Sequence, residues 1–172
     1  VKSYAAAVQG ISATVVTIEV NCTKGIQFFL VGLPDVAVRE SHERIISALQ
    51  VSGYKFPRNR IVINMAPADI RKEGSSYDLP LAIGILAAAE ELDASRLGHY
   101  MMMGELSLDG SLNSVKGILP IAIKAREEGF KGFIVPKQNA REAAVVNDLD
   151  VYGVSTIKDC LLYTSDAADD TP

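Results

Sequence analysis

The chain has 172 residues, 48% of them apolar and 22% charged, so it can bury one hydrophobic core as one domain. No stretch approaches the roughly eighteen apolar residues of a membrane span, and the first residues are too soon polar for a signal peptide. The net charge of −4 argues against a chain that wraps nucleic acid over its whole surface, but it is compatible with a local basic patch. Two cysteines, Cys22 and Cys160, form no disulfide or metal pattern and favour a reducing, cytoplasmic location.

The first half of the chain predicts strands and one helix. Apolar residues alternate in residues 13–22 and a second strand is expected at 26–32, so we expect these two segments to pair as a hairpin. Residues 35–50 have apolar side chains at helical spacing. Residues 60–67, rich in branched side chains, predict the next strand.

The second half alternates helices and strands. Residues 78–92 predict a helix buried nearly all round, and residues 99–113 predict two short strands around a turn at Asp109 and Gly110. Helices are then expected at 117–129 and 137–148, and strands at 132–136 and 151–154. The predicted fold class is mixed α/β (α+β), a mixed sheet with helices packed on it.

The end of the sequence differs in composition from the rest. Ser155 and Asp159 indicate a helix start, but small polar residues without an apolar face follow. Residues 160–172 resemble a translated sequencing-adaptor end, so we interpret 1–159 as the domain and 160–172 as a non-native or disordered tail. Under this interpretation Cys160 carries no functional weight.

Common nucleotide and metal motifs are absent from the sequence. There is neither a Walker A phosphate loop nor a G-x-G-x-x-G turn, and His42 and His99 have no second ligand at metal spacing, so we expect no metal site. Ser75 and Ser76, which precede the helix at residue 78, raise the question of whether one is a nucleophile. The alternative is a helix-entry turn whose hydroxyls cap the first amides.

Two segments, residues 64–88 and 103–136, resemble the catalytic domain of Lon proteases, whose fold is shared with a ribosomal small-subunit protein. The "GELSLDG" sequence at residues 104–110 matches the Lon pattern without a gap, and Ser76 matches the nucleophilic serine. The resemblance places Leu119 where Lon has its catalytic lysine. Because a leucine cannot accept a proton, the resemblance implies a degenerate site, and only a rearranged Lys116 would offer another base.

A longer resemblance is to the ComM/YifB family of magnesium-chelatase-like AAA+ proteins. It is carried by "VGLPDVAVRES", "NRIVINMAPADIRKEG" and "YDLPLAIGIL". The resemblance implies a degenerate Lon-like domain in front of an ATPase domain that this chain does not include. The family implies a hexameric motor that binds ATP and Mg and acts on DNA in branch migration, recombination and natural transformation. We expect no cofactor in this segment.

A local basic cluster is the candidate DNA contact of such a ring. It lies at the two ends of one predicted strand, and a few phosphate contacts per subunit would add up around a ring. The alternative is that these are solvated loop charges; Arg44 on the first helix is likewise interpreted as a subunit contact or a solvated charge. The members of the cluster are Lys55, Arg58, Arg60, Arg71 and Lys72.

Three functions follow from this sequence. The favoured one is a non-catalytic module that assembles the motor and contacts DNA. The alternatives are an active Ser–Lys peptidase that uses Ser76, and a protein-interaction scaffold of a magnesium-chelatase-like complex without DNA affinity.

Overall fold

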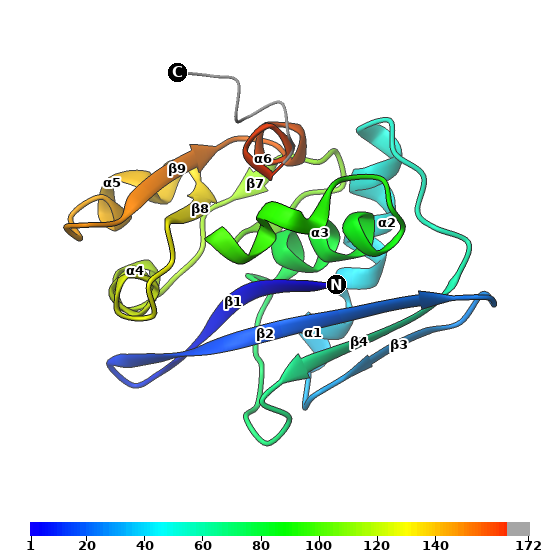
Figure 1. The fold of residues 1–172 in the computed structure, drawn as a ribbon, viewed down its shortest axis with the longest axis horizontal. Helices are drawn as coiled ribbons and strands as arrows, with labels where there is room; N and C mark the ends of the chain where they lie inside the picture. Colours follow the sequence, from blue (N-terminus) through cyan, green and yellow to red (C-terminus); the bar gives the residue numbers. More distant parts are fainter. Residues whose placement is uncertain (165–172) are drawn as a thin grey trace.

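The structure, a computed structural model, describes residues 1–164. Its larger sheet has the strand order β1-β2-β4-β3, in which β1–β2 and β2–β4 are antiparallel and β3–β4 is parallel (Figure 1). A two-residue turn at Gly10 and Ile11 joins β1 to β2. The four strands are β1 (Lys2–Gln9), β2 (Ser12–Thr23), β3 (Phe28–Val31) and β4 (Arg60–Ala66).

The predicted hairpin between residues 13–22 and 26–32 is wrong. Strand β2 pairs instead with β1 and β4, and β3 lies parallel to β4. Strand β1 causes this different pairing. It was not predicted from the sequence, because its inward residues are small. Ser3, for example, lies under a helix and donates its hydroxyl to Pro80 O at 2.8 Å. Once β1 occupies one edge of β2, the other edge pairs with β4, and β3 is left at the far edge of the sheet.

Helices cover the inner face of this sheet. They include α1 (Val36–Arg39) and α2 (Ser41–Val51), which replace the single helix expected at 35–50, and α3 (Asp78–Ala88). Helix α4 (Ile118–Glu127) also packs against β2. In α3 every residue from Asp78 to Ala87 is buried, which confirms the expected burial, although the helix ends earlier than residue 92. Gly84 allows the close approach, since a Cβ there would lie 3.0 Å from Val20 Cγ2.

A second layer completes the fold (Figure 1). Its three-stranded parallel sheet has the order β5-β8-β9, and β6 and β7 form the short hairpin that residues 99–113 predicted. The helix expected at 137–148 is reduced to two short turns. The strands are β5 (Tyr100–Met102), β6 (Glu105–Leu106), β7 (Leu112–Asn113), β8 (Gly132–Pro136) and β9 (Asp150–Val154). The helices are η1 (Ala94–His99), α4 (Ile118–Glu127), η2 (Lys137–Asn139), α5 (Ala140–Ala143) and α6 (Ile157–Thr164). The mixed fold class is thus confirmed.

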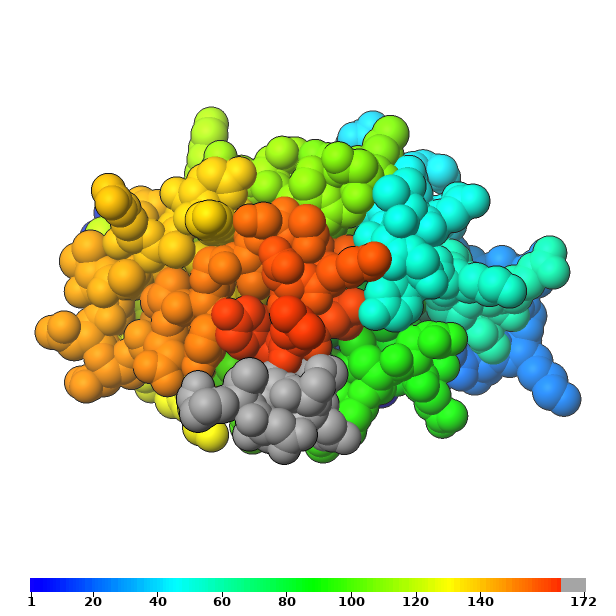
Figure 2. Space-filling model, turned by 90° about the horizontal axis from the view of Figure 1, so that it is seen from above, coloured from blue at the N-terminus to red at the C-terminus, as the bar shows by residue number. Residues whose placement is uncertain are grey.

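Helix α6 continues into the segment that was interpreted as a tail. Cys160, Leu161 and Thr164 are buried, and Cys160 Sγ lies 3.9 Å from Met102 Sδ. Figure 2 shows β9 and α6 in orange and red in the middle of one face, beside the cyan residues of α2. Residues 160–164 therefore do have an apolar face. The rest of the predicted tail, 165–172, lies outside the described residues, and the domain boundary at 159 stays a prediction. None of the helices in residues 1–164 is long and apolar enough to cross a membrane.

Candidate functional site

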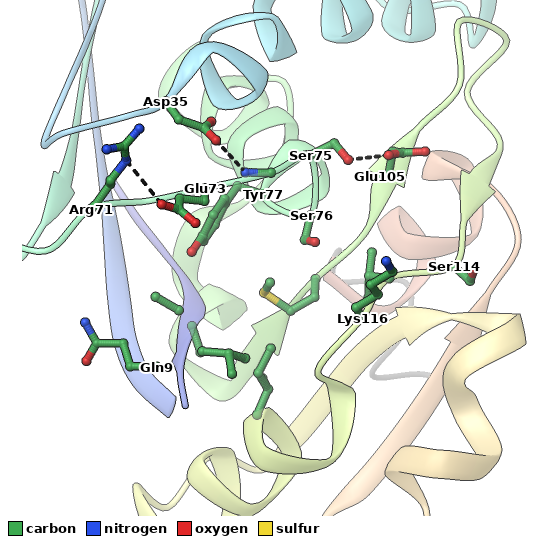
Figure 3. A pocket seen from close by; sticks show the side chains of 17 residues that line it. Gln9, Asp35, Arg71, Glu73, Ser75, Ser76, Tyr77, Glu105, Ser114 and Lys116 are labelled. Atoms are coloured by element: carbon green, nitrogen blue, oxygen red, sulfur yellow. Dashed lines mark hydrogen bonds and ion pairs between the residues drawn. The ribbon is translucent and has the colours of Figure 1, made fainter. Parts of the chain in front are cut away.

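A cleft of about 750 Å³ lies between the end of β1, the loop before α3 and the segment before α4 (Figure 3). Its rim is charged and part of its lining is apolar. The residues that line it are Ala6, Ala7, Val8, Gln9, Asp35, Arg71, Glu73, Gly74, Ser75, Ser76, Tyr77, Met103, Glu105, Ser114, Val115, Lys116 and Ile121.

A buried lysine holds one wall of the cleft. Lys72 is fully buried, and its amine donates to Gly32 O at 2.8 Å and to Pro67 O. Burial lowers the pKa of this amine. The backbone around it is also bonded, because Asp35 N donates to Lys72 O at 2.9 Å. The Asp35 carboxylate accepts from Val38 N at 2.8 Å and from Gly74 N at 3.1 Å, so it joins the start of α1 to the loop before α3.

Ser75 and Ser76 do not cap α3. The N-cap of this helix is Tyr77, which makes no side-chain capping bond. The Ser75 hydroxyl donates to Glu105 Oε1, and Asn113 Nδ2 donates to Glu105 Oε2 at 2.9 Å. The Ser75 hydrogen bond lowers the pKa of Glu105. Ser75 and Ser76 therefore do lie in the turn before α3, as predicted. The predicted capping is wrong, because the Ser75 hydroxyl donates to the Glu105 carboxylate across the cleft.

A buried ion pair supports the other side of the same turn. Arg44 Nε donates to Asp78 Oδ2 at 2.7 Å, and Arg44 Nη2 donates to Asp78 Oδ1 at 2.9 Å. Asp78 also accepts from Leu106 N at 3.0 Å. Burial raises the pKa of Asp78, and the Arg44 hydrogen bonds oppose that rise. Arg44 is therefore not a solvated charge: it fixes the start of α3 against α2 and β6.

The protease-like arrangement is incomplete. Ser76 is half-buried in the cleft, while Leu119 is 38% exposed and does not line it. Lys116 does line the cleft, on the wall opposite the loop before α3 (Figure 3). Within residues 1–164, however, no hydrogen bond joins Lys116 to the Ser76 hydroxyl. A serine without a hydrogen-bonded base is a weak nucleophile.

The basic cluster expected from the sequence is divided. Lys55 and Arg58 are exposed near the first residue of β4, where Arg60 lies 5.2 Å over the Phe29 ring. Arg71 lies beyond the other end of that strand, roughly 20 Å away at the usual strand rise, on the rim of the cleft. Its Nε is 3.2 Å from Glu73 Oε1.

Lys72 does not belong to this basic cluster, contrary to the prediction. Its amine is fully buried and donates to two carbonyl oxygens, so it cannot reach a phosphate.

His42 also differs from the expected surface histidine. Its ring stacks on Phe28 at 3.8 Å, and burial lowers its pKa. Among the described residues, no group of three or more His, Cys, Asp or Glu side chains is arranged to hold a metal ion.

Comparisons with known proteins agree with the sequence resemblance. Competence protein ComM of Haemophilus influenzae is 45% identical over 161 residues, which are 93% of this chain and 31% of that protein. YifB of Escherichia coli is 45% identical over 139 residues, 80% of this chain and 27% of that protein. Lon protease 2 of Bacillus subtilis is 28% identical over 118 residues, 69% of this chain and 20% of that protein.

The chain thus spans less than a third of the length of these relatives. The family model described as subunit ChlI of Mg-chelatase matches residues 18–139, most of this chain. With this match, the chain belongs to the Mg-chelatase subunit ChlI family, and it is similar to ComM and YifB.

Proposed function

We propose that this chain is a non-proteolytic, Lon-like module of a ComM-type AAA+ motor that acts on DNA. The observation that carries the proposal is the 45% identity to a competence protein over 93% of the chain. In this proposal the ATP and Mg sites belong to the rest of a longer protein, which assembles as a hexamer in the cytoplasm. The module contributes ring assembly and DNA contact during branch migration.

The cleft supports the non-proteolytic part of the proposal. The resemblance to Lon places Leu119 at the position of the catalytic lysine, and a leucine cannot take a proton from Ser76. The nearby carboxylate, Glu105, is already bonded to Ser75 and Asn113, and its pKa is lowered, which makes it a weaker base.

The start of β4 supports the DNA contact. Residues 51–68 contain three basic residues and no acidic one, although the whole chain has a net charge of −4. Lys24 lies close to them, because its neighbour Thr23 pairs with Arg60 in the sheet. Such a local excess of positive charge binds phosphates, and the binding weakens as the salt concentration rises. In a ring, each subunit would add its own phosphate contacts.

The test is binding of duplex and branched DNA to this chain at low and moderate salt. The variant Lys55→Gln/Arg58→Gln/Arg60→Gln removes the basic residues near the start of β4, while Arg71→Gln at the other end is the matched control. We expect the triple variant to lose affinity and to reduce the salt slope by about one per lost phosphate contact. If the chain binds no DNA, either free or cross-linked into oligomers, the DNA-contact proposal is wrong. The protein-interaction scaffold would then be the better function.

Peptidase activity is a second candidate because Ser76 and Lys116 line one cleft. Labelling with a serine-directed phosphonate separates it from the first. An active dyad would be labelled at Ser76 and would lose the label in Lys116→Met. We expect no labelling above that of Ser76→Ala.

A further inference from the structure

Strand β3 is an edge strand whose free side has unpaired backbone groups. It lies beyond β4 at the outer side of the larger sheet (Figure 1). Ile61 N donates to Gln27 O at 2.8 Å, which sets the phase of the parallel ladder. In that phase Phe29 bonds to β4, so the N–H and C=O groups of Phe28 and Leu30 point away from β4. Within residues 1–164, no hydrogen bond is made to these groups of Phe28 and Leu30.

The side chains of this edge strand are apolar on both faces. Phe28 and Leu30 pack against the core, whereas Phe29 is 42% exposed and Val31 is 47% exposed on the outer face. Four apolar residues in succession are typical of a parallel strand that is buried on both faces. Natural proteins protect a free edge with charged residues, proline or a bulge, and Phe28–Val31 have none of these. The free side of β3 therefore has the composition of a surface that a partner covers.

The unpaired groups fit a second copy of the same strand. In an antiparallel ladder, a hydrogen-bonded pair exchanges two bonds and occurs at every second residue. Because Phe28 and Leu30 flank Phe29, a copy rotated by 180° about Phe29 places Phe28 opposite Leu30 of the copy, and Leu30 opposite Phe28 of the copy. These two pairs satisfy the unpaired groups of both strands. Phe29 then lies opposite Phe29 of the copy, as a cross-strand aromatic pair on the outer face.

The charges at the two ends of β3 favour the same antiparallel arrangement. Lys24 precedes the strand, and Arg60 lies beside its start, 5.2 Å over the Phe29 ring. Beyond the other end, residues 32–43 contain three carboxylates and one arginine. An antiparallel copy brings the basic end of each strand beside the acidic end of the other, whereas a parallel copy would bring like charges together. Complementary charges of this kind set the orientation of two partners.

We propose that β3 pairs with β3 of a second copy of this chain about a two-fold axis at Phe29, so that the two larger sheets become one continuous sheet. Such a contact uses the same surface on both copies and therefore closes as a dimer. A ring is built from contacts between two different surfaces, so this pairing is additional to the ring proposed above and does not rest on it. The test is made without DNA, and its outcome is separate from that of the DNA-binding experiment.

Sedimentation equilibrium of the unmodified chain measures the dimer between about 10 μM and about 1 mM. Phe29→Lys places two positive charges opposite each other at the axis, and we expect it to weaken dimerisation at least about tenfold. Val145→Lys is the matched control, because it introduces the same charge at an exposed valine away from β3. We expect it to change the affinity less than about threefold.

Circular dichroism checks that both variants are folded. No dimer of the unmodified chain up to about 1 mM, or equal affinities of the two variants, would overturn the proposal.

Cysteine variants test the register, and they do so even if Phe29→Lys does not fold. Each also carries Cys22→Ser, because Cys22 is only partly buried, whereas Cys160 is fully buried. Opposite residues of a non-hydrogen-bonded pair have Cα atoms about 4.5 Å apart, within the range of a disulfide. On mild oxidation we expect Phe29→Cys to form a linked dimer by itself, and Gln27→Cys to do so only when mixed with Val31→Cys. If Gln27→Cys alone is linked as fast as Phe29→Cys, the proposed register is wrong.

Discussion

The two ends of strand β4 have the same kinds of charged residue but hold them differently. Near the cleft, Lys72 is buried on carbonyl oxygens and Arg71 is paired with Glu73. Near the first residue of β4, Lys55 and Arg58 are exposed in a segment without acidic residues. A charge taken from water needs partners, whereas an exposed charge does not. The buried charge of Lys72 at the cleft therefore stabilises the fold, whereas the exposed charges at the other end are available to an outside partner.

The largest effect is expected where the buried ion pair of the cleft turn is broken. Asp78→Ala leaves Arg44 without its carboxylate and Leu106 N without its acceptor, and we expect a loss of about 3 kcal/mol in the free energy of unfolding. Urea denaturation followed by circular dichroism measures it. Replacing both partners, as Asp78→Leu/Arg44→Met, should recover part of the loss. If Asp78→Ala loses less than about 0.5 kcal/mol, the Arg44–Asp78 pair contributes no more to stability than an exposed salt bridge does.

The next effect concerns the buried amine of Lys72. Lys72→Met keeps most of the side-chain volume but leaves two carbonyl oxygens without their donor, so we expect a loss of about 2 kcal/mol. The same denaturation experiment applies, with Arg71→Met as the control because the neighbouring arginine is exposed. If the two variants are equally stable, the buried amine of Lys72 contributes no more to the free energy of unfolding than the exposed Arg71 does.

A smaller effect is expected in the pH dependence of stability. The pKa of Glu105 is lowered from its ordinary value of 4.5, mainly by the Ser75 hydrogen bond. Its contribution to stability is therefore present above pH 4.5 and is lost as the pH falls through the lower, folded-state pKa. Ser75→Ala should remove up to about 1 kcal/mol at neutral pH and flatten the loss below pH 4.5. Unfolding curves at a series of pH values test this, and unchanged slopes would contradict it.

The smallest effect is expected at the exposed end of β4. Arg58→Gln removes a charge with no partner in the described part of the chain, so stability should change by less than about 0.5 kcal/mol. Thermal unfolding measures this, with Lys55→Gln as a parallel variant. A marked loss of stability would mean that this end, too, uses its charges inside the fold, and the contrast between the two ends would disappear.

The elements that could be predicted are those whose signal lies in a short window. The buried helix α3 and strand β4 were recognisable from their apolar residues, as was the hairpin of β6 and β7 from its Asp109–Gly110 turn. The family was recognisable from long matching segments. Strand β1 was missed, because alanines on its inner face give a weak alternation, and with it the pairing of β2 was misjudged.

Some features of the candidate site could also be predicted from the sequence, whereas others depend on how the segments pack. The resemblance to Lon, counted along the chain from "GELSLDG", implies that Leu119 occupies the position of the Lon lysine. By contrast, contacts between segments far apart in the chain decide that Lys72 is buried and that Ser75 bonds to Glu105. Residue type and spacing determine local structure and family, but whether a polar group faces water or another segment is settled only when the segments pack.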